Sequence, residues 1–189
     1  MVEETIASID EFTRNLVKAL NDCAVQYMLI GGIPAMHYGR PRSTVDCDVA
    51  IFLKEEDIPK FCACLTGHGF EVDEKDVQMA FKEKSHFNAY RKSEYGFRAD
   101  FSWKKTSLDE YGFKRAKKLE VFGVTAIVEA PEDIIIAKLV YGSQQDFEDA
   151  AAILKRQKNL DINYLQSRAI QENITAPLEK LFKFVEKWK

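Results

Sequence analysis

The segment between residues 27 and 53 constrains the fold of this chain more than any other. Tyr27–Ile30 is a short apolar run that ends at Gly31-Gly32, which is typical of a strand entering a tight turn. Residues 33–38 can form a short helix, and residues 45–53 alternate at first and then become apolar, as in a central strand. The segment therefore predicts a strand, a glycine turn, a short helix and a second strand.

Two aspartates of the second strand, Asp46 and Asp48, are two residues apart and so project from the same face. Neighbouring ionised carboxylates repel each other and need a cation if they are both to be buried. Mg²⁺ prefers oxygen ligands and commonly shares them with substrate phosphates. The pair is thus a candidate metal site, although the same spacing also occurs on solvated sheet faces.

Residues around the pair suit a phosphate group. A glycine turn that opens a helix can offer backbone N–H groups to an anion, and Gly31-Gly32 has this position. Arg40 and Arg42 could neutralise a triphosphate, and Thr44 could donate a hydrogen bond to it. The alternative for these residues is an ordinary tight turn followed by a solvated loop.

A third carboxylate, Asp100, lies in the alternating run 97–103, on the polar face of a predicted neighbouring strand. Three carboxylates from two adjacent strands can hold two metal ions that clamp the attacking and leaving oxygens of an in-line displacement. The alternative is a solvated strand aspartate.

The rest of the chain predicts an α+β fold, with a mixed β-sheet flanked by helices and a C-terminal helical segment. Expected helices begin at Ser8, which has a capping-box pattern, and near Pro59. Expected strands are 86–91 and 97–103, joined by a turn, and 119–129, a strand or a hairpin bent at Gly123. We divide the chain into a core, 1–130, and a helical segment packed on it, 131–189.

The helical segment shows several start and stop signals. Pro131 suits the first turn of a helix, and Gly142 suits its end. A second helix is expected near Gln145, and Asp161 and Thr175 are plausible caps of two more.

Composition excludes several classes of protein. The 189 residues suit one domain, and a formal charge of −3 excludes nucleic-acid binding by bulk charge. No apolar run approaches the roughly 20 residues of a membrane span, and the acidic start lacks signal-peptide features, so we expect a cytoplasmic protein without a membrane partner. Cys62-Ala-Cys64 has no second pair at zinc-ribbon spacing, so we expect reduced, structural cysteines.

The spacing Gly31-Gly32, thirteen residues, then Asp46-x-Asp48 resembles the signature of the DNA polymerase β-like nucleotidyltransferase superfamily. Residues 38–48 are most similar to the abortive-infection toxin type and to small minimal nucleotidyltransferases of bacteria and archaea. The segment 131–139 and the later Asp146-Phe-Glu-Asp149 also resemble these groups, which often carry a helical lysine and then an acidic D-x-x-D helix start.

The resemblance implies metal ligation, with Mg²⁺ as cofactor, and triphosphate binding. The implied ligands of Mg²⁺, which are also the catalytic residues, are Asp46, Asp48 and Asp100. The implied nucleotide-binding residues are Gly31, Gly32, Arg42, Thr44, Lys138 and Asp146. The sequence departs from the superfamily at Gly32, where many members have serine, and at Ser143-Gln144-Gln145, where some have a basic residue.

The resemblance and the residues together predict a Mg²⁺-dependent nucleotidyltransferase. It would move a nucleoside monophosphate from a nucleoside triphosphate to an acceptor and release pyrophosphate. Three kinds of acceptor remain open: tRNA, a protein or a small molecule. A tRNA acceptor would fit a toxin with an antitoxin partner. The alternatives are a nucleotide- or protein-binding module of the same fold with weakened catalysis, and an antibiotic-modifying nucleotidyltransferase.

Overall fold

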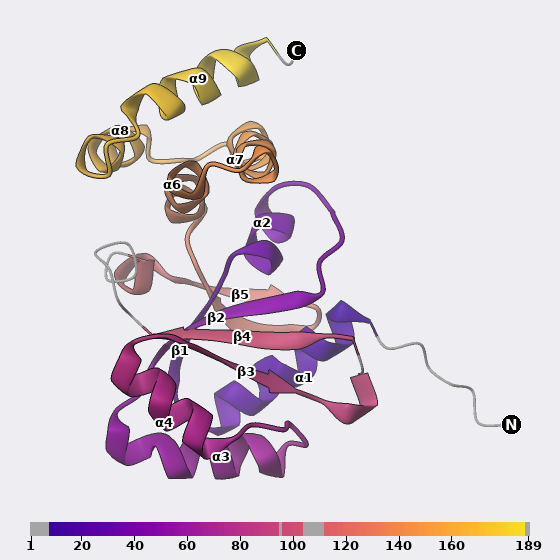
Figure 1. Ribbon diagram of the computed structural model, residues 1–189. Helices are drawn as coiled ribbons and strands as arrows, with labels where there is room; N and C mark the ends of the chain where they lie inside the picture. The colour runs from indigo at the N-terminus through magenta and orange to yellow at the C-terminus, as the bar shows by residue number, and fades with distance from the viewer. Residues whose placement is uncertain (1–7, 95, 104–111, 188–189) are drawn as a thin grey trace, which may run out of the picture.

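A six-stranded mixed sheet forms the centre of the protein in the computed structural model, which describes residues 8–94, 96–103 and 112–187 (Figure 1). The strand order is β3-β4-β2-β1-β6-β5. The bounds are β1 Gln26–Ile30, β2 Asp46–Phe52, β3 His86–Tyr90, β4 Arg98–Trp103, β5 Lys117–Val121 and β6 Val124–Val128.

The pairing of the central strands makes the sheet mixed. β2 runs antiparallel to β1 and parallel to β4, and β1 runs parallel to β6. The two outer pairs, β3 with β4 and β5 with β6, are antiparallel. The predicted α+β class with a mixed sheet is therefore confirmed.

Helices cover both faces of the sheet. Figure 1 shows α1, α3 and α4 on one side, and α2 with α6 to α9 on the other. The bounds are α1 Ile9–Asp22, α2 Gly32–Tyr38, α3 Ile58–Gly67, α4 Glu74–Glu83, α6 Pro131–Tyr141, α7 Gln144–Arg156, α8 Ile162–Gln171 and α9 Thr175–Glu186. Short 3-10 turns span Glu55–Asp57 and Lys92–Glu94. None of the described helices is long and apolar enough to cross a membrane.

Strand β2 has one apolar face and one partly polar face. Cys47, Val49 and Ile51 are fully buried, while Asp46 and Asp48 are only half-buried. The apolar face packs against α1, whose Phe12 and Leu16 are also fully buried. Because side chains alternate along a strand, this packing turns the two aspartates toward the opposite face, on the side of α2.

Most of the predicted helix ends are found in the structure. The Ser8 hydroxyl accepts a hydrogen bond from the Glu11 N–H at 3.2 Å, and the Asp161 carboxylate accepts one from the Tyr164 N–H at 2.9 Å. Gly142 ends α6 in the left-handed region, at φ +70°. Thr175 was wrong as a cap: it is the first residue of α9, and Ile174 at the cap position provides no side-chain hydrogen bond.

Two further differences concern secondary structure. Helix α4 was not expected, because its sequence is mostly charged and buries only Val77 and Ala80, which is too few for a clear helical period. The segment 119–129 is a hairpin, the second of the two expected forms. Its turn, Phe122-Gly123, has positive φ at both residues, as a type I′ turn requires.

The expectation that Cys62 and Cys64 are both reduced was wrong for Cys64. Cys23, directly after α1, forms a disulfide with Cys64 of α3, with the two Cα atoms 5.7 Å apart. Cys47 and Cys62 are free and buried. The bonded residues are 41 positions apart, so only the packing of α1 beside α3 brings them within bridging distance.

Candidate active site

The sheet brings the three predicted carboxylates to one face, and we call Asp46, Asp48 and Asp100 the carboxylate cluster. In the parallel register of β2 and β4, Asp48 is the direct partner of Asp100. Residues that are paired across two strands project from the same side of the sheet, and Asp46 lies on that side too. All three side chains are partly exposed.

Arg98 is the residue that sequence reasoning missed in this cluster. It is the register partner of Asp46. Its Nε lies 3.0 Å from Asp46 Oδ1 and donates to Asp100, at 2.9 Å from Oδ1 and 3.2 Å from Oδ2. The signal that could have found it is its position two residues before Asp100, on the same polar face of the alternating strand.

The surroundings of Asp48 disfavour the ionised form of its carboxyl group. Burial, above all, raises the pKa of this carboxyl, and the negative charges of Asp100 and Asp46 raise it further. The Gly32 N–H, which donates to Asp48 Oδ2 at 3.4 Å, and the positive charge of Lys138 act in the opposite direction on the same pKa. The site therefore has more negative charge near Asp48 than it has close cations to balance it.

The glycine turn lies directly against the carboxylate cluster. Gly31 has a φ of +67°, and a Cβ there would lie 2.3 Å from Asp48 Oδ2, so a side chain cannot be accommodated without moving Asp48. A Cβ at Gly32 would lie 3.0 Å from the Arg42 guanidinium and 3.3 Å from the Thr44 hydroxyl. The Thr44 hydroxyl donates to the Asp46 carbonyl at 3.3 Å. The side chains of Asp48, Arg42 and Thr44 therefore all lie close to the glycine turn.

A second group of charges surrounds the first turns of α7. We call it the α7 charge cluster, and it consists of Arg40, Arg42, Lys138, Asp146, Glu148 and Asp149. Asp149 is at its centre, with only 2% of its side chain exposed, 3.2 Å from Arg42 Nε and 3.3 Å from Lys138 Nζ. Arg40 pairs with Glu148 at the exposed rim. Every charge of this cluster has an opposite charge beside it.

Lys138 is not an ordinary solvated helix lysine. Its side chain is 11% exposed, and Nζ donates to Asp146 Oδ1 at 2.7 Å. The other Asp146 oxygen accepts from the N–H and hydroxyl of Ser143, which completes a capping box at the start of α7. Burial would raise the pKa of Asp146, but the hydrogen bonds from Lys138 and Ser143 outweigh it and lower this pKa.

Asp149 was absent from the predicted site residues, although the Asp146-x-x-Asp149 spacing was recognised. Residues three apart on a helix lie on the same side, so both carboxylates reach Lys138. The spacing was the signal, and the burial of Asp149 under Arg42 and Lys138 is what the sequence alone could not show.

The chemistry of the carboxylate cluster suits a hard divalent cation, because it offers carboxylate oxygens from two adjacent strands. Within the part of the chain that the structure describes, no group of three or more His, Cys, Asp or Glu side chains is disposed to hold a metal ion. Arg98 supplies the positive charge between Asp46 and Asp100 instead.

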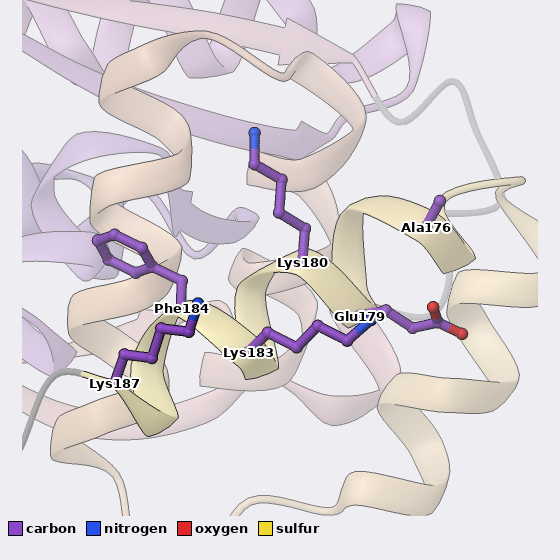
Figure 2. A pocket seen from close by; sticks show the side chains of 6 residues that line it. All are labelled: Ala176, Glu179, Lys180, Lys183, Phe184 and Lys187. Carbon is purple, nitrogen blue, oxygen red and sulfur yellow. The ribbon is translucent and has the colours of Figure 1, made fainter.

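A shallow hollow lies on α9. It is lined by Ala176, Glu179, Lys180, Lys183, Phe184 and Lys187, and Figure 2 shows lysine side chains along it. Lys180 Nζ lies 5.2 Å from the centre of the Phe147 ring of α7. The lining residues come from α9 and from Lys187 directly after it, and none of them is a residue that the sequence predicted for the site.

Comparison with known proteins finds solved structures of similar fold. The structure of the antibiotic-resistance factor ANT(2'')-Ia is similar over 94% of this chain and 95% of its own, with a TM-score of 0.54 and 14% identity. An antigenic nucleotidyltransferase-like protein from Paracoccidioides brasiliensis is similar over 92% and 91%, with a TM-score of 0.51 and 13% identity. At these identities the likeness is one of fold. No curated protein matches the sequence significantly.

The family described as "Nucleotidyltransferase of unknown function (DUF6036)" matches residues 4–188, which is nearly the whole chain. The match includes both strands of the carboxylate cluster and the helices of the α7 charge cluster. The chain therefore belongs to this nucleotidyltransferase family, the class of enzyme that the sequence predicted.

Proposed function

We propose that the protein transfers a nucleoside monophosphate from a nucleoside triphosphate to an acceptor in a Mg²⁺-dependent reaction. The observation that carries the proposal is the alignment of Asp48 with Asp100 across β2 and β4, with Asp46 on the same face. Next to this face lie the glycine turn and two cations, Arg42 and Lys138. Carboxylates for a metal and cations for phosphates are the two parts that such a reaction needs.

Asp46, Asp48 and Asp100 would hold Mg²⁺, which supplies charge neutralisation at the reacting phosphate. The acceptor oxygen attacks the α-phosphorus, the new P–O bond forms, and the bond to the pyrophosphate oxygen breaks. The acceptor loses a proton in this step, and Asp100 would accept it.

Arg42 and Lys138 would bind the departing pyrophosphate. Both are anchored by Asp149, so their charged ends are already positioned and lose little freedom when the substrate binds. Thr44 adds a hydroxyl beside Arg42. Gly31 and Gly32 keep the backbone close to both clusters, because side chains there would contact Asp48 or Arg42.

Titration calorimetry with each of the four nucleoside triphosphates, with and without Mg²⁺, tests the proposed site. We expect one triphosphate to bind more tightly with Mg²⁺, and Asp100→Asn to remove the Mg²⁺ effect. Asp76→Asn, which changes an exposed residue of α4 on the other side of the sheet, is the matched control and should bind normally. Equal binding with and without Mg²⁺ would contradict the proposed site.

A transfer assay distinguishes the acceptors. The protein is incubated with α-labelled triphosphate and Mg²⁺, and with tRNA, cell protein or a panel of small-molecule antibiotics in parallel. Label on tRNA supports the toxin type, in which expression of the chain should also arrest growth until an antitoxin is supplied. Label on an antibiotic supports the second candidate, which is favoured by the similarity of fold over nearly all of ANT(2'')-Ia. Tight binding without any transfer supports the module with weakened catalysis.

A further inference from the structure

We propose that Arg98 occupies the place of the divalent cation in the metal-free protein, and that it must leave the carboxylate cluster before the cation can bind. This inference rests on the proposed function, because it concerns the same three carboxylates. It adds a residue that controls whether the site is open to the cation.

The first observation is the position of the Arg98 guanidinium. Its Nε is 3.0 Å from Asp46 Oδ1 and 2.9 Å from Asp100 Oδ1, so one N–H group lies between two carboxylates from different strands. A cation that bridges β2 and β4 must contact oxygens of both strands. Arg98 already makes that bridge with its own positive charge.

The second observation is that the bridge is incomplete on the Asp46 side. The Arg98 N–H is directed to the two oxygens of Asp100. Asp46 Oδ1 is buried, and it accepts no hydrogen bond from any described residue, although Nε lies close to it. A buried carboxylate oxygen without a hydrogen bond is costly, so the cluster keeps an unsatisfied ligand atom beside Arg98.

The third observation is that Arg98 can leave easily. Arg98 is the first residue of β4, and its side chain is 45% exposed. Exposed ion pairs contribute little to stability. The Arg98 guanidinium and a divalent cation compete for the same oxygens of Asp46 and Asp100, and their positive charges repel each other at close range. Binding of a divalent cation therefore displaces the guanidinium into solvent, while the β2–β4 pairing remains as it is.

Manganese is the probe for the test, since the signal of free Mn²⁺ in electron paramagnetic resonance disappears on binding. Arg98→Gln removes the charge and keeps a polar side chain. We expect it to bind Mn²⁺ about tenfold more tightly than the unaltered protein, because the competing cation is gone. Lys92→Gln is the matched control: it also removes one positive charge, but Lys92 is an exposed residue paired with Glu71, and we expect the affinity of the unaltered protein.

A measurement on the unaltered protein complements the variant. The Nε–Hε resonance of Arg98 is assigned by its loss in Arg98→Gln or, if that variant fails to fold, in Arg98→Lys. We expect Mg²⁺ to shift this resonance toward the position of a solvent-exposed arginine and to speed its hydrogen exchange. The resonance of Arg14 should stay unchanged, because Arg14 belongs to α1 on the other side of the sheet and donates to the Phe122 carbonyl.

The outcomes separate this inference from the proposed function. If the unaltered protein and Arg98→Gln bind Mn²⁺ equally, or if Arg98→Gln binds it more weakly, Arg98 is not a competitor and the inference is overturned, while the metal site stands. An Arg98 resonance that Mg²⁺ leaves in place overturns it in the same way. If neither protein binds Mn²⁺, the metal site and the inference both fail.

Discussion

The carboxylate cluster and the α7 charge cluster lie on either side of the glycine turn, and they balance their charges in opposite ways. The carboxylate cluster consists of three acidic side chains, and the exposed Arg98 is the ion-pair partner of two of them, Asp46 and Asp100. The α7 charge cluster has cations and carboxylates in equal number, arranged so that each contacts an opposite charge.

The difference shows which cluster needs a ligand. Burial and neighbouring carboxylates raise the pKa of Asp48, so the carboxylate cluster is stabilised by any cation that enters it. The α7 charge cluster needs no added charge, and its buried Asp149 holds Arg42 and Lys138 in place. We interpret the first as a site kept ready for a cation and the second as a rigid support for phosphate-binding side chains.

The largest expected effect is that of Asp48→Asn. Loss of a carboxylate at the reacting phosphate should reduce transfer by roughly a hundredfold to a thousandfold. The same change should raise the melting temperature at pH 7. Asp48 has a raised pKa in the folded protein, so the folded state takes up a proton more readily than the unfolded state, and stability falls as the pH rises through that interval.

Thermal unfolding at several pH values tests the stability part. The gain from Asp48→Asn should be present at pH 7 and should shrink as the pH falls toward the range in which the Asp48 carboxyl is protonated in both states. Asp76→Asn should give no gain. If Asp48→Asn is destabilising at pH 7, the contrast between the two clusters is wrong.

Asp149→Asn should give the largest loss of stability in the α7 charge cluster. It removes a buried charge from beside Arg42 and Lys138, and breaking a buried ion pair typically costs about 3–5 kcal/mol. Chemical denaturation measures this change in the free energy of unfolding. Glu148→Gln is the matched control on the same helix: Glu148 pairs with Arg40 at the exposed rim, and we expect no measurable loss.

Arg42→Gln should affect substrate binding more than folding. A hydrogen bond from a charged group contributes about 1.5–3 kcal/mol, so the KM for the triphosphate should rise about tenfold or more, with a smaller change in kcat. Arg40→Gln, which changes the more exposed arginine, should have a weaker effect on KM. Equal effects of the two variants would contradict the assignment of Arg42, rather than Arg40, to the triphosphate.

Ser143→Ala should have the smallest effect, a loss of about 1 kcal/mol in the free energy of unfolding, as for other helix caps. Ser143 and Lys138 lower the pKa of Asp146, so the stability from this carboxylate is present at neutral pH and is lost as the pH falls through its lowered pKa. Without Ser143 the folded-state pKa should be less lowered, so this contribution should be smaller and should be fully lost at a higher pH. Acid-unfolding curves measure the shift, and Ser167→Ala, at an exposed position of α8, is the control.

Strand faces, turns and helix ends of this protein could be predicted from the sequence alone. Alternation in 45–53 placed Asp46 and Asp48 on one face, because side chains on a strand have a period of two. The apolar run before Gly31-Gly32 identified β1 and its turn, and Pro131 and Gly142 marked the ends of α6. These signals lie within a few residues of the features that they predict, so no knowledge of tertiary packing was needed.

Contacts between residues far apart in the sequence became known only from the tertiary structure. The parallel register of β2 and β4 aligns Asp48 with Asp100 and Asp46 with Arg98, and a shift by one residue would have turned one strand's set to the other face. Asp149 contacts Arg42 across more than a hundred residues, and Cys23 meets Cys64 through helix packing. Such contacts depend on how helices and strands pack to bury their apolar faces, and this packing depends on interactions throughout the chain.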